Sequence, residues 1–424
     1  MVRHMNKTRA RVLDAFRRRF GGEPAWLVRA PGRVNLLGAH IDYSEGWVLP
    51  GAIDRSIWLA LRPAEAPSST IEALDRRAEG AHLADITGVS DIVDIATLDT
   101  ARLPPPVPER GGEADGTWQD LPRGVAWTLA RAGHHLAPID AVFGGDLPMD
   151  AGVSSSAAVE VAFLMAWEAA SGFSLDGVER ARLGRRVEND YLGVGSGIMD
   201  QFASIHGKTG HLMLLDCRDL AFERIPLPDN VAVVIADSGI RRTLASSDYN
   251  RRPEECRQAV DLLRRALPEI RTLRDVTEED LDRHARVMLP SSLERRARHA
   301  VCECRRVLDG AEALRNGSLR RFGELMRESH ESSRDLYQVS LPELDALAST
   351  AWSAPGCFGA RLSGAGWGGC VTALVEEAAA EDVERRLRRE FARAFGHECE
   401  TFVAAFGDGA AIVDIGDSVD IADI

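Results

Sequence analysis

Hydrophobic and polar positions in the N-terminal half of this chain follow periods that predict both helices and strands. Amphipathic stretches at residues 1–20 and 118–132 predict helices. Short apolar runs broken by Gly, Pro, Asp and Asn predict strands joined by tight turns. Residues 63–115 are weakly patterned and rich in Ala, Asp and Pro, so strands and variable loops are expected there. The predicted strands are residues 34–37, 47–49, 57–61 and 139–143.

The second half alternates apolar runs with long stretches rich in Arg and Glu, which predicts strands between amphipathic helices. The change of character near residues 205–225 predicts a domain boundary, with domains at 1–215 and 216–424. The acidic residues 414–424 are expected to form a frayed tail. The predicted strands are 231–236, 369–375 and 401–405, and the predicted helices are 253–267, 292–314, 319–336 and 378–395.

The most informative stretch is residues 144–167, GGDLPMDAGVSSSAAVEVAFLMAW. A Gly-, Pro- and Asp-rich turn leads through Gly152-Val153-Ser154-Ser155-Ser156 into an apolar helix expected at 157–167. A helix N-terminus carries unpaired N–H groups and partial positive charge, so a loop of small residues before it can bind phosphate. The alternative is that the serines only cap the helix. Capping requires one serine and three are present, which favours phosphate binding.

Polar residues gather in two other places. The turns between the strands at 26–59 hold Arg33, Asn35, His40, Asp42 and Tyr43. Such turns are usually only solvated, but Arg, His and Asp between apolar strands are suitable for a site. A predicted helix also carries Glu188 into the glycine-rich GVGSG, which is followed by Asp200 and then by apolar residues.

Composition narrows the class of partner. The 424-residue chain has a net charge of −14 and no basic block, which argues against nucleic acid or an anionic membrane as partner. Only Lys7 and Lys208 are lysines, so a phosphate site must use arginine, metal or backbone N–H groups. The seven cysteines are scattered and odd in number, which favours a reducing cytoplasm over a disulfide framework. Neither a signal peptide nor an apolar run long enough to span a membrane is evident.

Two nucleotide-binding motifs match only in part. Residues 207–209, GKT, resemble the end of a phosphate-binding Walker loop, but Phe202 occupies the position that requires glycine. Gly364, Gly366 and Gly369 match the dinucleotide fingerprint G-x-G-x-x-G, yet the following CVTALV predicts a strand where the fingerprint needs a helix. Neither motif therefore supports its usual function.

Four strings in order, APGRVNLLGAHIDY, the serine loop, GSGIMDQF and SGAGWGGC, resemble the motifs of the GHMP small-molecule kinases. Within that superfamily the chain is most similar to the galactokinases. Two further segments of this chain, ADSGIRRTLASSDYNRRPEEC and LMRESHESSRDLYQVSLPELDAL, resemble the C-terminal segments of galactokinases. The resemblance covers nearly all of the chain except residues 63–115 and the acidic tail. It implies a two-domain α+β fold with the active site in the interdomain cleft, and a kinase that uses ATP and Mg²⁺ to phosphorylate the anomeric hydroxyl of a sugar. A monomer or weak homo-oligomer is expected.

The resemblance also implies roles for individual residues. The loop Gly152, Val153, Ser154, Ser155, Ser156 and Ala157 would bind ATP, and Ser156 with Glu188 would hold Mg²⁺. Asp200 would face the anomeric hydroxyl beside Arg33, either as general base or as an orienting group while Arg33 lowers the pKa of the hydroxyl. The glycine-rich loop 363–369 would close on the site. The residues expected to line the sugar pocket are Ala39, His40, Asp42, Gly197, Asp200 and Tyr249.

One position departs from the family pattern. Galactokinases typically read G-E-H-T-D-Y, with the Glu near the C6 hydroxyl of the sugar, where this chain has Ala39 in GAHIDY. A glutamate ~4 Å from a C6 carboxylate would cost on the order of 1–4 kcal/mol, so its absence favours galacturonate as substrate. Ala365, where galactokinases commonly have Gly, points the same way, and GAHID with SGAG resembles plant galacturonokinases. Galactose remains the alternative substrate, and a non-catalytic sugar sensor is a third hypothesis.

Overall fold

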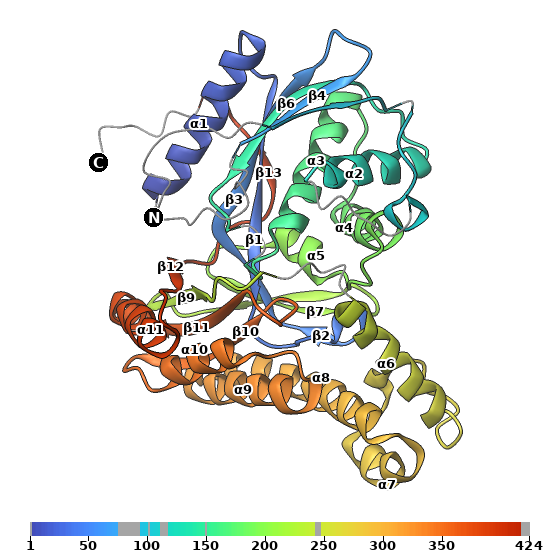
Figure 1. The fold of residues 1–424 in the computed structure, drawn as a ribbon, viewed down its shortest axis with the longest axis vertical. Coiled ribbons are helices and arrows are strands. Elements are labelled where there is room, and N and C mark those ends of the chain that lie inside the picture. Colours follow the sequence, from blue (N-terminus) through green and yellow to red (C-terminus); the bar gives the residue numbers. More distant parts are fainter. Residues whose placement is uncertain are drawn as a thin grey trace.

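A computed structural model describes residues 2–74, 94–100, 102–110, 118–148, 151–241 and 247–416. Helices and strands are mixed along the chain, which confirms the predicted α+β class. One half is built on a six-stranded sheet, and the other on a four-stranded sheet covered by helices (Figure 1).

The six-stranded sheet has the order β13-β1-β3-β6-β4-β5. Its neighbouring strands are antiparallel except β4 and β6, which are parallel. Because the last of these strands in the chain pairs with the first, the sheet joins segments from both ends of the described sequence. Its members are β1 (Trp26–Asn35), β3 (Pro50–Pro63), β4 (Ser69–Ala73), β5 (Asp94–Leu98), β6 (Ile139–Gly145) and β13 (Ala411–Val413).

Helices cover both faces of this sheet (Figure 1). On one face, α1 (Val2–Phe20) packs Val12 and Phe16 against Leu27 and Trp58 of the sheet. The other face is covered by α3, which is buried along most of its length because apolar residues surround it on every side. The helices on this side are α2 (Asp120–Arg131), α3 (Ser155–Ser171), α4 (Gly177–Arg186) and α5 (Met199–His206).

The other half is built on the antiparallel sheet β10-β11-β9-β12, and the small sheet β2-β7-β8 lies between the two halves (Figure 1). The strands are β2 (Trp47–Val48), β7 (His211–Asp216), β8 (Phe222–Pro226), β9 (Val231–Asp237), β10 (Cys357–Ser363), β11 (Cys370–Glu376) and β12 (Glu400–Ala404). The helices are α6 (Ser247–Leu263), α7 (Glu278–Met288), α8 (Ser291–Arg315), α9 (Leu319–Ser332), α10 (Pro342–Trp352) and α11 (Ala380–Phe395).

Most predicted elements are present, with shifted ends. The strand expected at 34–37 ends at Asn35, because Gly38 takes a left-handed turn with φ of +96°. The helix expected at 253–267 begins at Ser247 and accommodates Pro253 within its second turn. Residues after Gly369 form β11, as predicted, and α7 and α10 were not predicted.

The division of the chain at residue 215 stays a prediction. Strand pairings cross it, among them β7 with β8 and β1 with β13. Parts of the weakly patterned 63–115 segment and of the acidic tail lie outside the described residues.

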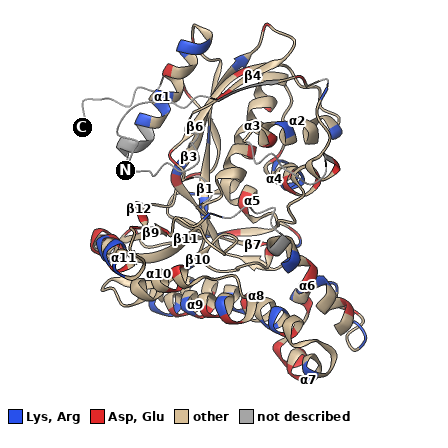
Figure 2. Ribbon diagram, in the orientation of Figure 1, with Lys and Arg blue, Asp and Glu red and all other residues tan. Residues whose placement is uncertain are grey.

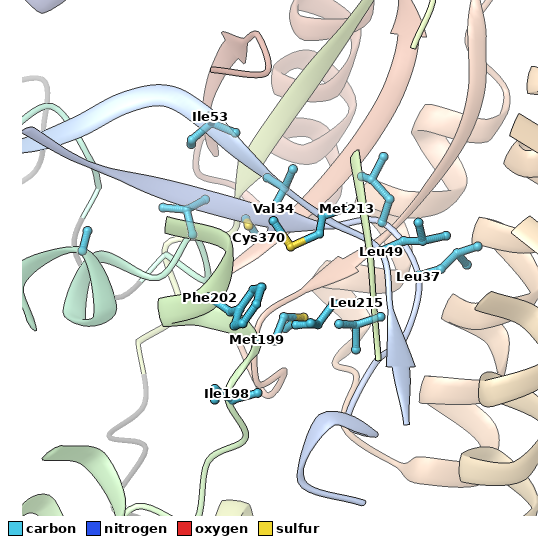
Figure 3. Close-up of a cluster of buried hydrophobic side chains, with 14 of the residues drawn as sticks. Val34, Leu37, Leu49, Ile53, Ile198, Met199, Phe202, Met213, Leu215 and Cys370 are labelled. Carbon is cyan, nitrogen blue, oxygen red and sulfur yellow. The ribbon is translucent and has the colours of Figure 1, made fainter. Parts of the chain in front are cut away.

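A continuous hydrophobic cluster supports the junction between the halves. Figure 3 shows Val34 from β1, Met199 and Phe202 from α5, and Met213 and Leu215 from β7 converging in this cluster. Val34 follows Arg33 in sequence, and Met199 precedes Asp200. The backbones that carry these two polar residues are therefore anchored in a close-packed core.

The surface carries both signs of charge. Blue and red residues intermingle along α8, α9 and α11 (Figure 2), and many form pairs one helical turn apart, such as Arg305 with Asp309 and Arg327 with Glu331. All seven cysteines are unpaired thiols. Among the described helices, none combines the length and the apolar character that crossing a bilayer would require.

Candidate active site

A pocket lies where the two halves meet, and residues of both halves line it. This arrangement places the serine loop, the 33–43 turn and the glycine-rich 363–369 loop around one space. Val153 and Ala157 are fully buried and do not line the pocket. The expected site residues that do line it are Arg33, Ala39, His40, Asp42, Gly152, Ser154, Ser155, Ser156, Glu188, Gly197, Asp200 and Tyr249.

Arg33 and Asp200 form a bidentate ion pair in this pocket. Arg33 Nε donates to Asp200 Oδ1 at 2.7 Å, and Nη2 donates to Oδ2 at 2.6 Å. The remaining Arg33 nitrogen, Nη1, donates to the carbonyl of Gly152 at 2.9 Å. Arg33 therefore links the carboxylate directly to the serine loop, in a planar geometry that only a guanidinium provides.

Ser154 does not act as an ordinary helix cap. It occupies the N-cap position of α3 with a left-handed backbone (φ +59°) and makes no side-chain capping bond. Its hydroxyl instead donates to Asp200 Oδ2. The capping alternative is therefore wrong for Ser154, and the unpaired N–H groups at the start of α3 stay available to an anion.

Glu188 lies on a π-helical turn, Val187–Leu192, and its carboxylate accepts a hydrogen bond from Ser196. Burial, followed by the charge of Asp200, raises the pKa of Glu188 to about 7. Glu160 lies behind it in α3, is bound by Gln201 Nε2 at 2.8 Å, and has a pKa well above its usual range because of burial and the charge of Glu188. Acidic groups this close together favour a cation.

The residues present fit Mg²⁺ held together with nucleotide phosphates. Ser156 and Glu188 both line the pocket and offer oxygen ligands, which Mg²⁺ prefers. Within the described ranges, no group of three or more His, Cys, Asp or Glu could hold a metal. A site with one carboxylate and one hydroxyl is therefore incomplete until phosphate oxygens join it, as is usual for Mg²⁺ at kinase sites.

The turn after β1 provides the opposite wall. Asp42 lies against Gly197, where any side chain would overlap its carboxylate. Burial, and then the charge of Asp200, raises the pKa of Asp42 to about 6. Tyr249 from α6 places its ring 5.8 Å from that of His40.

His40 connects this turn to the glycine-rich loop. Its Nε2 is 2.9 Å from the carbonyl of Ala365 and therefore carries the proton, so Nδ1 accepts from the Tyr43 hydroxyl at 3.1 Å. Tyr43 in turn bonds Tyr337 at 2.6 Å. Burial, and then the neighbouring His299, lower the pKa of His40 to about 3, so the ring is neutral.

The glycine-rich loop touches the serine loop directly. A Cβ on Gly152 would lie 2.6 Å from the carbonyl of Ser363, and one on Gly364 would lie 2.8 Å from Gly152 Cα. Gly152 and Gly364 also have positive φ angles of 77° and 79°. This close backbone approach explains why the two halves meet through glycines.

Sequence reasoning missed several pocket residues. Ser196 lies within GVGSG, and a hydroxyl in such a flexible segment was the only available signal. Arg361 lines the pocket just before the glycine-rich 363–369 loop, at a position where no local pattern distinguished it. Glu160 does not line the pocket, but it could have been noticed as an acid within the apolar stretch expected to form a helix.

Comparisons with known families and structures agree with this geometry. The GHMP kinase N-terminal domain model matches residues 120–208, and the GHMP kinase C-terminal model matches residues 311–393. A model described as the galactokinase galactose-binding signature matches residues 14–63. Mevalonate kinase from Methanococcus jannaschii shares the fold, with a TM-score of 0.58 at 18% identity over 91% of this chain and 99% of its own. The fold and the pocket thus define a GHMP-type kinase.

Full-length relatives narrow the class. A galactokinase from Roseiflexus sp. is 42% identical over 94% of this chain and 96% of its own length. Human galactokinase is 37% identical over 95% of this chain and 96% of its own. The crystal structure of Lactococcus lactis galactokinase complexed with galactose superposes with a TM-score of 0.82, at 30% identity over 95% of this chain and 98% of that one. The chain belongs to the galactokinase family, and it is a sugar kinase rather than a non-catalytic sensor.

Proposed function

We propose that this protein transfers the terminal phosphoryl group of ATP to the anomeric hydroxyl of D-galactose, giving galactose 1-phosphate and ADP. The observation that carries the proposal is the Arg33–Asp200 pair, which joins the serine loop to the turn covered by the galactose-binding signature. A phosphate acceptor and a phosphate donor bound at these two places would lie side by side.

The pair suits phosphoryl transfer, which depends on positioning and on neutralising oxygen charge. A carboxylate has about four lone-pair positions, and Arg33 and Ser154 fill three at Asp200. The remaining position would accept the hydrogen of the sugar C1 hydroxyl and take its proton as the phosphoryl group moves. Arg33 would hold the carboxylate in place and offset charge on the phosphate.

The N-terminus of α3 and the loop before it would bind the ATP phosphates through backbone N–H groups. Ser156 and Glu188 would hold Mg²⁺, which neutralises charge on the phosphate oxygens when it is bound. On the sugar side, Asp42, His40 and Tyr249 would line the pocket, with Ala39 at its wall.

The comparisons favour galactose, the alternative substrate, over galacturonate. The relatives of 35–42% identity are galactokinases, and the structural relative holds galactose.

The test is ADP release with a panel of galactose, galacturonate, glucose and N-acetylgalactosamine, with the product examined by phosphorus NMR. Galactose should give the highest kcat/KM and a phosphate on C1. Greater turnover of galacturonate, or phosphate on another carbon, would refute the proposal.

A further inference from the structure

The backbone of the sugar turn is held by a set of buried groups from α8 that the catalytic argument has not used. Glu303 Oε1 accepts the N–H of Gly38 at 2.9 Å and the N–H of Ala39 at 3.0 Å. His299, one helical turn earlier on the same face of α8, has its Nε2 3.1 Å from the carbonyl of Ala39. The N–H and the carbonyl of Ala39 are therefore both hydrogen-bonded to side chains of α8.

A second layer fixes these two α8 side chains. Ser329 of α9 donates to Glu303 Oε1 at 2.6 Å, and Ser332 of α9 lies 2.8 Å from His299 Nδ1. Because the Ala39 carbonyl can only accept, the proton of His299 is on Nε2, and Ser332 donates to Nδ1. The same order, α9 serine to α8 side chain to turn backbone, thus occurs twice.

The buried carboxylate is electrostatically compensated. Glu303 is fully buried, and Arg306 pairs with its second oxygen. Burial by itself raises the pKa of Glu303, but Arg306, His299 and Arg361 together lower it to about 2. Glu303 is therefore ionised, and an ionised oxygen is the strongest available acceptor for two adjacent backbone N–H groups.

We infer that Glu303 and His299 are positioning residues for sugar binding, which set the turn that carries His40 and Asp42 without touching the substrate. Gly38 and His40 both have left-handed backbones, with φ of +96° and +56°, a conformation that costs free energy for a non-glycine residue such as His40. The hydrogen bonds at Gly38 and Ala39 offset that cost and orient His40 toward Ala365. Without them the turn would relax, and the His40 and Asp42 side chains would leave the pocket wall.

The alternative is that Glu303 and Arg306 form only a structural ion pair. Glu168 supplies a matched control, because it is also buried, binds Arg180 through both oxygens (2.6 and 2.8 Å) and accepts the N–H of Leu175 at 2.9 Å, so its partners lie outside the turn that Glu303 binds. Glu303→Gln and Glu168→Gln therefore remove the same charge from similar surroundings.

The experiment compares steady-state kinetics of wild type, Glu303→Gln and Glu168→Gln. Glu303→Gln should raise the KM for sugar on the order of tenfold, as expected when charge-assisted hydrogen bonds weaken, and leave the KM for ATP within about twofold. Glu168→Gln should change neither constant. An equal rise of both KM values in Glu303→Gln, or equal effects of the two substitutions, would overturn the inference.

Hydrogen exchange gives a readout that does not depend on which sugar is the substrate. The amides of Gly38 and Ala39 should exchange faster in Glu303→Gln than in wild type, and at the wild-type rate in Glu168→Gln. Wild-type exchange rates of these two amides in Glu303→Gln would refute the inference that Glu303 positions the turn. If the wild type does not phosphorylate galactose, only the proposed function is refuted. The kinetic comparison rests on that function, whereas the hydrogen-exchange comparison does not. Where Glu303→Gln does not fold, Ser329→Ala removes one donor to the same oxygen. It should raise the sugar KM roughly threefold with the ATP KM unchanged, and equal effects on both would again contradict the inference.

Discussion

Arg33 and Asp200 lie 167 positions apart in the chain, yet both oxygens of the carboxylate accept hydrogen bonds from one guanidinium, at 2.7 and 2.6 Å. The strand β1 supplies the arginine and the first turn of α5 supplies the aspartate. Because the residues adjoining them, Val34 and Met199, share one core cluster, the pair is held in place before any ligand binds.

Replacing Asp200 with Asn keeps its shape and removes its charge. Turnover should fall by ~10²–10⁴, the usual contribution of a positioned acid–base group, while nucleotide binding persists. The measurements are kcat and the Kd for nucleotide. Asp216→Asn is the control, because both oxygens of Asp216 also accept from one arginine, through Nη1 and Nη2 of Arg274, away from the pocket. Near-normal turnover in Asp200→Asn would contradict the assignment.

Ser154→Ala tests whether the serine serves the carboxylate rather than the helix. Since Ser154 makes no capping bond, the substitution should lower kcat about tenfold with little loss of thermal stability. Thr277 is a true cap that accepts the N–H of Asp280 at 3.1 Å, and Thr277→Ala should show the reverse, about 1 kcal/mol less stable with unchanged turnover. Melting curves and kcat of both variants decide the matter. A large loss of stability in Ser154→Ala would restore the capping role.

Glu188→Gln removes the proposed carboxylate ligand of Mg²⁺. The Mg²⁺ concentration for half-maximal activity should rise on the order of tenfold, because one charged oxygen ligand becomes neutral. Glu160→Gln is the matched control, because Glu160 is a buried carboxyl of α3 that is bound by Gln201 and does not line the pocket. Activity is titrated with Mg²⁺ at saturating ATP. The same Mg²⁺ dependence in both variants would argue against Glu188 as a ligand.

Asp42 should make stability depend on pH. Burial, and then Asp200, raises its pKa from 3.8 to about 6 in the folded protein. Between these values the unfolded chain has released the proton and the folded protein has kept it, so this residue's contribution falls as pH rises and is constant above about pH 6. Asp42→Asn removes that loss. Its free energy of unfolding relative to wild type should therefore increase by on the order of 3 kcal/mol between about pH 3.5 and pH 7.

Urea unfolding at several pH values measures this difference. Asp280 provides a control of opposite sign, because its hydrogen bond from Thr277 lowers its pKa. The contribution of Asp280 is present above its unfolded pKa and lost as pH falls, so Asp280→Asn should lose stability relative to wild type as pH rises. A difference between Asp42→Asn and wild type that is constant with pH would show that folding does not raise the pKa of Asp42.

Local signals explain how far the sequence predicted the site. Glycine- and serine-rich loops, and polar residues in turns between apolar strands, are visible without a structure, and most of the pocket wall consists of such residues. Element ends were less predictable: the strand at 34–37 stops at Asn35 because the backbone turns at Gly38. Pro253 was expected at a helix start, the usual place for proline, yet α6 begins at Ser247 and includes it.

The remaining residues depend on contacts between distant segments. His299 and Glu303 lie in RARHAVCECRRV, which has the charge pattern of a solvated helix face. They are functional candidates only because α8 places them against the turn at Gly38, 265 residues earlier in the chain. The galacturonate prediction was drawn from the side chain at position 39 alone, and the full-length relatives, which are galactokinases, favour galactose instead.

The pairing of β13 with β1 has a consequence for biosynthesis. Leu27, Val28 and Arg29 of β1 take Val413, Ile412 and Ala411 as partners, so the strand that carries Arg33 gains its outer neighbour only after nearly all of the described chain has been translated. Until then β1 is an unprotected edge, open to pairing with other chains. A ribosome that stalls before residue 411 would release a polypeptide that holds the serine loop, Asp200 and the other strands of the six-stranded sheet, yet exposes one edge of the strand that carries Arg33. Cellular quality control would then meet the unpaired backbone groups of β1 as the mark of an incomplete chain.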